Sequence, residues 1–148
     1  MKQEVLITLR GTQTYAQEQP ESIELMTRGT MTGRNGKFAI SYEETELTGV
    51  KGTTTTFLVL NPKRIVLTRE GTIRSRMVFE EDSKHEALYD LGFGSLLISI
   101  CARKIVVDLS EAGGKLLIDY TVEVEQSMSS RNAYEIFVEP ITEKKQDV

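Results

Sequence analysis

Arg69 is the side chain whose type and position most clearly could do chemistry. It shares parity with Ile65 and Leu67, so in an extended strand the three side chains project to one face. If that face lines an interior, the guanidinium needs a partner, because an unpaired buried charge costs several kcal/mol. Two interpretations remain open: a clamp for the carboxylate or phosphate of a ligand, or a rim arginine paired with a loop carboxylate such as Glu43 or Glu44.

Three tyrosines and an asparagine could orient such a ligand. Tyr42 ends an apolar stripe, Tyr89 shares parity with His85, and Tyr120 lies inside a third alternating run. A phenol in a cavity combines apolar area with a hydroxyl, as ligand sites often require. The same tyrosines could equally be core residues that bond the backbone. Asn132 could offer its amide to a ligand or cap a turn, and the turn is the preferred interpretation.

The only histidine and the only cysteine give weaker signals. His85 lies in a charged run, and the ligand spacing around it matches no zinc pattern, so we predict no metal and no other cofactor. General acid–base catalysis by His85 with Tyr89 or Arg69 is an open alternative, but we assign no catalytic residue. A nucleophilic Cys101 would need His85 beside it, and a half-buried apolar thiol is the simpler interpretation. The candidate ligand-binding residues are therefore Tyr42, Arg69, His85, Tyr89 and Asn132.

Composition excludes several function classes. The chain has 148 residues and a net charge of -4, which argues against nucleic acid as a partner because phosphate binding requires excess Lys and Arg. No signal segment opens the sequence, and no apolar run approaches the length of a membrane helix. With one cysteine no intramolecular disulfide can form. We expect a cytoplasmic protein without a membrane partner.

The elements that position these residues follow from a period-two alternation that recurs along the chain. Turn signals such as Asn35-Gly36, Asn61-Pro62-Lys63, Glu70-Gly71 and Gly113-Gly114 separate the runs. This spacing predicts an all-β fold, a single antiparallel up-and-down barrel of about 8–10 strands, with a β-sandwich or jelly roll as the alternative. We expect one barrel domain over residues 1–140, a loop over 43–52 and a polar tail over 141–148.

A series of short signatures resembles one family. They are Glu43 with Leu47-Thr48-Gly49, Gly52 with Thr53 to Thr56, Arg69-x-Gly71, Met77-x-Phe79-Glu80, His85 with Tyr89 before Gly92 and Gly94, Gly113-Gly114 before Ile118-x-Tyr120, and Ser130-Arg131-Asn132. In order and spacing the chain resembles the uncharacterised YwiB-like family of small bacterial proteins, from about residue 3 to 139. The resemblance implies a calycin-like (lipocalin-like) β-barrel in a bacterial cytoplasm, and it implies no activity.

Three functional hypotheses remain open. The first is a small-molecule-binding barrel for an anionic or amphiphilic ligand. The second is a homodimeric or protein-interaction module that uses an exposed sheet face around Leu97, Cys101 and Val106. The third, ranked last, is a hydrolase-type enzyme that uses His85.

Overall fold

The computed structural model describes residues 1–15, 19–45, 49–90, 94–124 and 128–141, and the side chain of Tyr89 lies outside this description. Within these residues the chain forms strands joined by turns, with no helix that could cross a membrane. The strands are β1 (Lys2–Tyr15), β2 (Glu21–Arg34), β3 (Lys37–Glu43), β4 (Thr53–Asn61), β5 (Arg64–Gly71), β6 (Ser75–Glu80), β7 (Lys84–Asp90), β8 (Ser95–Ser110), β9 (Gly113–Val124) and β10 (Met128–Pro140).

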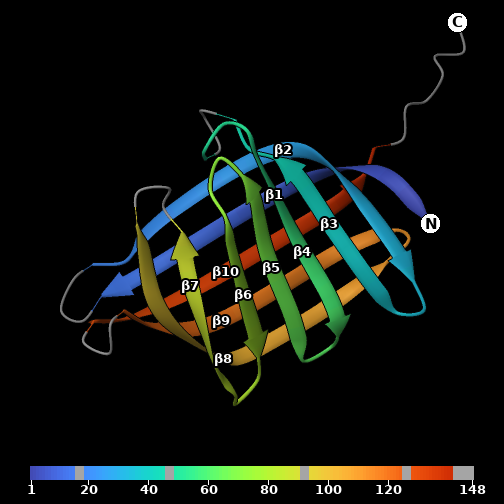
Figure 1. The fold of residues 1–148 in the computed structure, drawn as a ribbon. Coiled ribbons are helices and arrows are strands. Elements are labelled where there is room, and N and C mark those ends of the chain that lie inside the picture. The colour runs from blue at the N-terminus through green and yellow to red at the C-terminus, as the bar shows by residue number, and fades with distance from the viewer. Residues whose placement is uncertain (16–18, 46–48, 91–93, 125–127, 142–148) are drawn as a thin grey trace, which may run out of the picture.

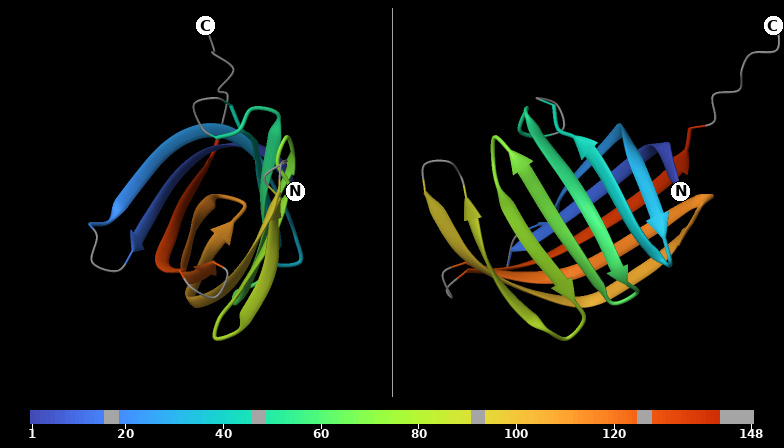
Figure 2. Two further views of the ribbon diagram at one scale, coloured as in Figure 1. Left: turned by 60° about the vertical axis from the view of Figure 1, so that its left-hand side comes forward. Right: turned by 45° about the vertical axis from the view of Figure 1, so that its right-hand side comes forward.

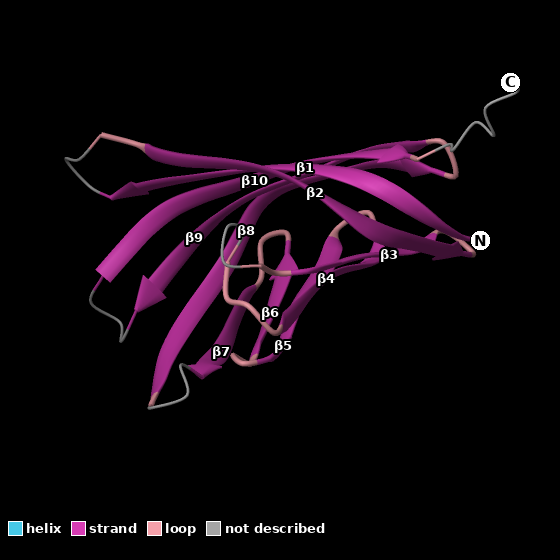
Figure 3. Cartoon of the chain, turned by 90° about the horizontal axis from the view of Figure 1, so that it is seen from above, coloured by secondary structure: helices cyan, strands magenta, loops and turns pink. Residues whose placement is uncertain are grey.

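All ten strands belong to one antiparallel sheet in the order β6-β5-β4-β3-β2-β1-β10-β9-β8-β7. Neighbours in the sheet are also neighbours in sequence except β1 and β10, which pair from Val5–Pro140 to Tyr15–Ser130 and join the two halves of the chain. The sheet curls until β3–β6 face β1, β10, β9 and β8 across the interior (Figures 1 and 3). The predicted all-β up-and-down barrel is confirmed.

Closure of the barrel is incomplete, so two strand edges remain. β6 and β7 end the sheet and are bridged only at Glu80–Ser83, beside their common turn, from which they diverge (Figure 2). That turn docks on a bulge of β8: the Glu81 carboxylate accepts a hydrogen bond from the Ile105 amide at 3.0 Å, and the Asp82 amide donates to the Ala102 carbonyl at 3.1 Å. Bulges bend a strand locally, and here the pairing of β8 with β9 continues beyond the bulge.

Turn chemistry sets the hairpins much as the sequence predicts. Asn35 and Gly36 have φ of 54° and 77°, the left-handed pair that a two-residue hairpin loop requires. The Asn61 side chain accepts a hydrogen bond from the Lys63 amide at 2.8 Å and fixes the next turn. The break predicted at Glu70-Gly71 is displaced, because β5 continues to Gly71 and β6 begins at Ser75.

The inner face of the sheet forms the core. Alternate side chains fill the end of the barrel where β1 begins, and those fully buried there include Ile7, Met31, Ile40, Ile65, Phe79, Ile100, Leu116 and Ile136. The parity sets predicted from the sequence therefore face inward. Ile23, which has the same parity as Leu25, is 70% exposed because it lies at the other end of the barrel, where the packing stops.

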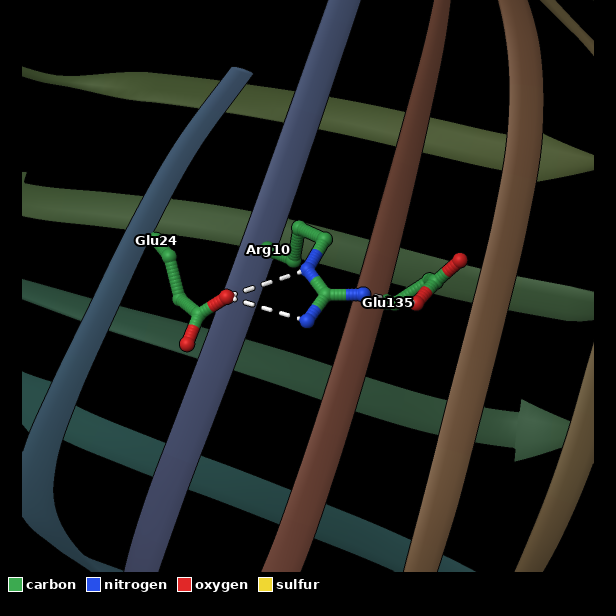
Figure 4. A network of polar contacts seen from close by, with 3 residues as sticks. All are labelled: Arg10, Glu24 and Glu135. Carbon is green, nitrogen blue, oxygen red and sulfur yellow. Dashed lines mark hydrogen bonds and ion pairs between the residues drawn. The ribbon is translucent and has the colours of Figure 1, made fainter.

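The outer face of β2, β1 and β10 carries a cross-strand charge network. Arg10 contacts Glu24 at 3.0 Å and Glu135 at 3.5 Å from the strand between them (Figure 4). All three side chains are exposed, so each pair contributes little stability. One row further along, Met26 and Phe137 are exposed on either side of Thr8.

Substitution of two glycines tests the backbone conformations at these turns. Gly36→Ala adds a methyl group that meets nothing within 4 Å, so only the left-handed φ opposes it, and we expect a loss of about 1–2 kcal/mol in the free energy of unfolding. Gly71→Ala combines a φ of 131° with a collision against the Gly52 carbonyl, and we expect a loss of about 3 kcal/mol or more. Urea denaturation measures both, and equal losses would contradict the close approach of Gly71 to Gly52.

Candidate functional site

The end of the barrel where β1, β3, β5 and β9 finish is hollow. A cavity of about 450 Å³ opens there. This volume lies within the range of small-molecule sites, roughly 300–1,000 Å³. Its apolar wall includes Leu9, Leu25, Leu67, Met77, Ile98 and Val122. The barrel therefore has a packed end and a hollow end.

A row of polar side chains crosses one wall at the level of the cavity. Register places Tyr42 opposite Thr55, Thr55 opposite Arg69, and Arg69 opposite Ser75, on the inner faces of β3, β4, β5 and β6. We call these four residues the polar row. The row beneath it is apolar, and three of its members, Phe57, Leu67 and Met77, also line the cavity, so the cavity extends from the polar row to the edge of the packed core.

Arg69 is bound by a carboxylate of this chain. Its Nη2 donates to Glu44 Oε1 at 2.6 Å and to Oε2 at 2.9 Å, and the two side chains are only 16% and 5% exposed. The Glu44 carboxylate lies directly over Gly49, where a Cβ would collide with it. The pairing expected of a rim arginine is thus present, with Glu44 as the partner, and it ties the loop after β3 to the polar row.

Several buried hydroxyls beside this ion pair lack hydrogen bonds. Among the described residues, the Oγ1 of Thr53 and the Oγ of Ser75 have no hydrogen-bond partner, and the Oγ1 of Thr55 has none of regular geometry, although the Tyr42 phenol interacts with it. Thr55 is 3% exposed and lines the cavity. Because an unsatisfied buried polar group costs about 1–3 kcal/mol, such hydroxyls indicate a position where a bound molecule would gain hydrogen bonds.

The opposite wall is aromatic. Tyr120 and Tyr134 stack with ring centroids 5.6 Å apart and an interplanar angle of 26°. Tyr120 packs edge-on against Phe79 at 4.7 Å, and Tyr134 packs edge-on against Phe57 at 5.8 Å. The four rings run from the packed core into the cavity, and they offer flat apolar surface to whatever occupies it.

Gly11 makes room in front of this wall. It lies opposite Tyr134 on the inner face of β1, and a Cβ at this position would meet the Tyr134 ring at 3.7 Å, an ordinary contact. A side chain here would therefore project into the cavity without displacing the backbone. Nearby, the Asn132 amide donates to the Ser130 hydroxyl at 2.9 Å, and both are buried.

Burial keeps the phenols of the cavity protonated. The pKa of Tyr42 is raised to about 12, first by burial and then by the charge of Glu44 and by Tyr134, while Arg69 and Thr55 oppose the rise. Burial, followed by the proximity of Tyr134 and a hydrogen bond with it, raises the pKa of Tyr120 well above its usual value. At neutral pH both side chains are hydrogen-bonding groups without charge.

The structure brings three of the five predicted residues together. Tyr42, Arg69 and Asn132 line the cavity. His85 does not: it lies beside the β6–β7 turn, with its Nε2 3.2 Å from Glu80 Oε1. Tyr89 pairs with Leu96 through its backbone, and its side chain falls outside the described residues.

No catalytic constellation forms around His85 in the part of the chain that is described. Its hydrogen bond lowers the pKa of the Glu80 carboxyl, the largest of several influences on that group. Cys101 lies opposite Lys84 rather than His85, so the two side chains occupy opposite faces of the sheet. The described residues contain no group of three or more His, Cys, Asp or Glu that could hold a metal ion.

Sequence reasoning missed Thr55, Tyr134 and Gly11 as site residues. Tyr134 shares parity with Ile136, so its inward direction is predictable from the sequence. Its place beside Tyr120 depends on the register of β9 against β10, which no local signal reveals.

Comparisons with known proteins agree with this fold. The model of a family described as "Domain of unknown function (DUF1934)" matches residues 7–136. The uncharacterized β-barrel protein YwiB of Bacillus subtilis is 29% identical over 126 residues, which span 84% of this chain and 86% of YwiB. The crystal structure of ywiB protein from Bacillus subtilis superposes with a TM-score of 0.73 at 20% identity, over 95% of this chain and 94% of that one.

The buried ion pair makes a first prediction for this site. Arg69→Met or Glu44→Gln leaves one charge without its partner, so each should lower the free energy of unfolding by about 2–4 kcal/mol, and the double variant should lose clearly less than the sum. Urea denaturation of the wild type, both single variants and the double variant measures the coupling energy between Arg69 and Glu44. The matched exposed pair, Arg10→Met and Glu24→Gln, should couple by no more than about 1 kcal/mol. Additive losses at Arg69 and Glu44 would contradict the account.

The raised pKa of Tyr42 leads to a second prediction, which concerns stability at alkaline pH. The pKa of Tyr42 is about 12 in the folded protein against an ordinary value of 10.0, so the folded state retains a proton that the unfolded chain loses. The resulting stability is fully present below about pH 10 and is lost as the pH rises through 12. Tyr42→Phe should therefore lose less stability between pH 10 and pH 12 than the wild type does in urea titrations. An unchanged pH dependence would contradict the burial of this phenol.

Proposed function

Because this chain belongs to the DUF1934 family, whose description assigns no activity, we propose its function from the cavity: it is a barrel that binds a small amphiphilic molecule. The observation that carries the proposal is a hollow barrel end in which a mainly apolar wall of strand side chains surrounds the buried hydroxyl of Thr55, which has no hydrogen-bond partner of regular geometry. A core evolved only for stability would be packed and would leave few buried polar groups unpaired.

The cavity suggests how such a ligand lies. Its apolar or aromatic body packs against the Tyr120–Tyr134 wall, where Gly11 leaves room. Its polar end reaches the polar row, where Thr55 and the Tyr42 phenol provide hydrogen bonds. This division between apolar body and few oriented polar groups is the usual composition of small-molecule sites. The calycin-like character and the cytoplasmic location expected from the family resemblance are compatible with it and stay predictions.

A homodimeric interaction module is the second candidate. The patch predicted around Leu97, Cys101 and Val106 is half-buried rather than exposed. Leu88, opposite Leu97, is 64% exposed and adds to this patch. A second group of exposed apolar side chains is formed by Met26 and Phe137 on the outer face of β2 and β10. They lie one row from the exposed network of Arg10, which limits the apolar area, so this candidate ranks below the cavity.

Native mass spectrometry of protein purified from its own host tests the proposal. We expect extra mass that is lost on denaturation, corresponding to one bound molecule per chain. Gly11→Leu places a side chain into the cavity and should remove that mass, while the fold is retained because leucine suits a strand better than glycine does.

Thr8→Leu is the matched control. Thr8 lies on the same strand with its side chain on the outer face, so the added leucine leaves the cavity unchanged, and the bound mass should persist. Loss of the adduct in both variants, or in neither, would contradict binding in the cavity. A bare dimer in the wild-type spectrum would instead favour the interaction module.

A further inference from the structure

We propose that the cavity selects uncharged aromatic or amphiphilic molecules and rejects net anions, because Glu44 occupies the position at Arg69 that an anionic group would take. This inference rests on the proposed function and adds the charge of the ligand to it. It resolves the choice between an anionic and an amphiphilic ligand, which the sequence alone leaves open.

The geometry of the Arg69–Glu44 ion pair opposes an anionic ligand. Glu44 places both carboxylate oxygens within 2.9 Å of Arg69 Nη2, and its side chain is 5% exposed. A ligand carboxylate or phosphate at this guanidinium would have to displace Glu44 or lie beside it. Displacement leaves a buried carboxylate without its partner, and adjacency places two anions in contact, so either arrangement opposes binding.

The charge balance of the whole cavity also opposes an anionic ligand. Among the described residues that line it, Arg69 is the only lysine or arginine, whereas the acidic residues are Glu44 and Glu21. The lining therefore carries one positive and two negative charges when these groups are ionised. An entering anion finds no net positive potential, because Glu44 compensates the one cation and Glu21 adds a negative charge near the opening.

The ionisation of Tyr42 reports the electrostatic effect of the ion pair at this place in the cavity. The Tyr42 oxygen lies in the polar row beside the ion pair, and a phenolate there would be an anion at the place where a ligand's polar end would bind. Glu44 raises the pKa of Tyr42 more than Arg69 lowers it. The pair as a whole thus disfavours negative charge at this position, in agreement with the charge balance.

The walls of the cavity also favour a particular kind of ligand body. The stacked rings of Tyr120 and Tyr134 present an aromatic surface, and the hydroxyls of Thr55 and Tyr42 provide neutral hydrogen-bonding groups near it. Aromatic faces pair well with flat rings, and buried hydroxyls pair with neutral donors or acceptors without an additional charge to desolvate. A planar ring system with an uncharged polar group fits both requirements.

Two fluorescent probes with the same ring system test the selectivity. Phenylnaphthylamine is uncharged, and anilinonaphthalene sulfonate carries one sulfonate on that skeleton. Both brighten in apolar surroundings, so a titration of each into the wild-type protein gives its affinity. We expect the neutral probe to bind about tenfold or more tightly than the sulfonate, and Gly11→Leu to abolish binding of the neutral probe.

Charge variants then identify the cause. Glu44→Gln should narrow or reverse the preference by strengthening sulfonate binding, and circular dichroism confirms that the variant is folded. If Glu44→Gln fails to fold, the double variant Arg69→Gln with Glu44→Gln replaces it, since removal of both charges leaves neither uncompensated. There the preference for the neutral probe should shrink.

The outcomes separate the two proposals. Sulfonate binding equal to or tighter than binding of the neutral probe, abolished by Gly11→Leu, would overturn the charge selectivity and keep the cavity as a ligand site. An unchanged preference in the charge variants would also overturn the role of Glu44. Absence of binding by either probe, or binding that Gly11→Leu leaves intact, would count against the ligand-binding function itself.

Discussion

A guanidinium held inside a barrel requires a counter-charge, and the hollow end of this protein is organised around that requirement. Arg69 points inward because its strand alternates, and Glu44 reaches it from the loop that follows β3. The contact holds the Glu44 carboxylate close against Gly49, where a Cβ could be placed only if that carboxylate moved away. It also neutralises the only cation of the described cavity lining, so a single interaction determines both local structure and the electrostatics of the site.

The interior is divided into two zones by the composition of successive cross-strand rows. Rows of buried Ile, Leu, Val and Phe fill one end, and the next row along β3–β6 is polar. On the facing wall, Gly11 and the stacked tyrosines keep the space open. Stability therefore comes from the packed zone together with the β1–β10 pairing, which leaves the other zone available for binding.

Period-two alternation was sufficient to predict the barrel, the inward direction of Arg69 and the two-residue turn at Asn35-Gly36, because each depends on local chain geometry. It placed Tyr42 correctly on the inner face, whereas the turn preferred for Asn132 is wrong, because this residue lies within β10 opposite Tyr120 and lines the cavity. It could not separate His85 from them, since parity gives the face of a strand and not the height along the barrel, and His85 lies beside the β6–β7 turn, away from the cavity. The contact of Tyr120 with Tyr134, and the opening of the sheet between β6 and β7, depend on long-range strand pairing that sequence patterns do not encode.

The central claim is that the cavity between the polar row and the stacked tyrosines is open and binds a ligand. A high-resolution crystal structure of the protein purified from its own host, without added ligand, tests this most directly. The account predicts continuous non-protein density against the Tyr120 and Tyr134 rings, with an atom within hydrogen-bond distance of Thr55 Oγ1. Side chains collapsed into that volume, with Thr55 bonded to a protein group and no density between the walls, would contradict it.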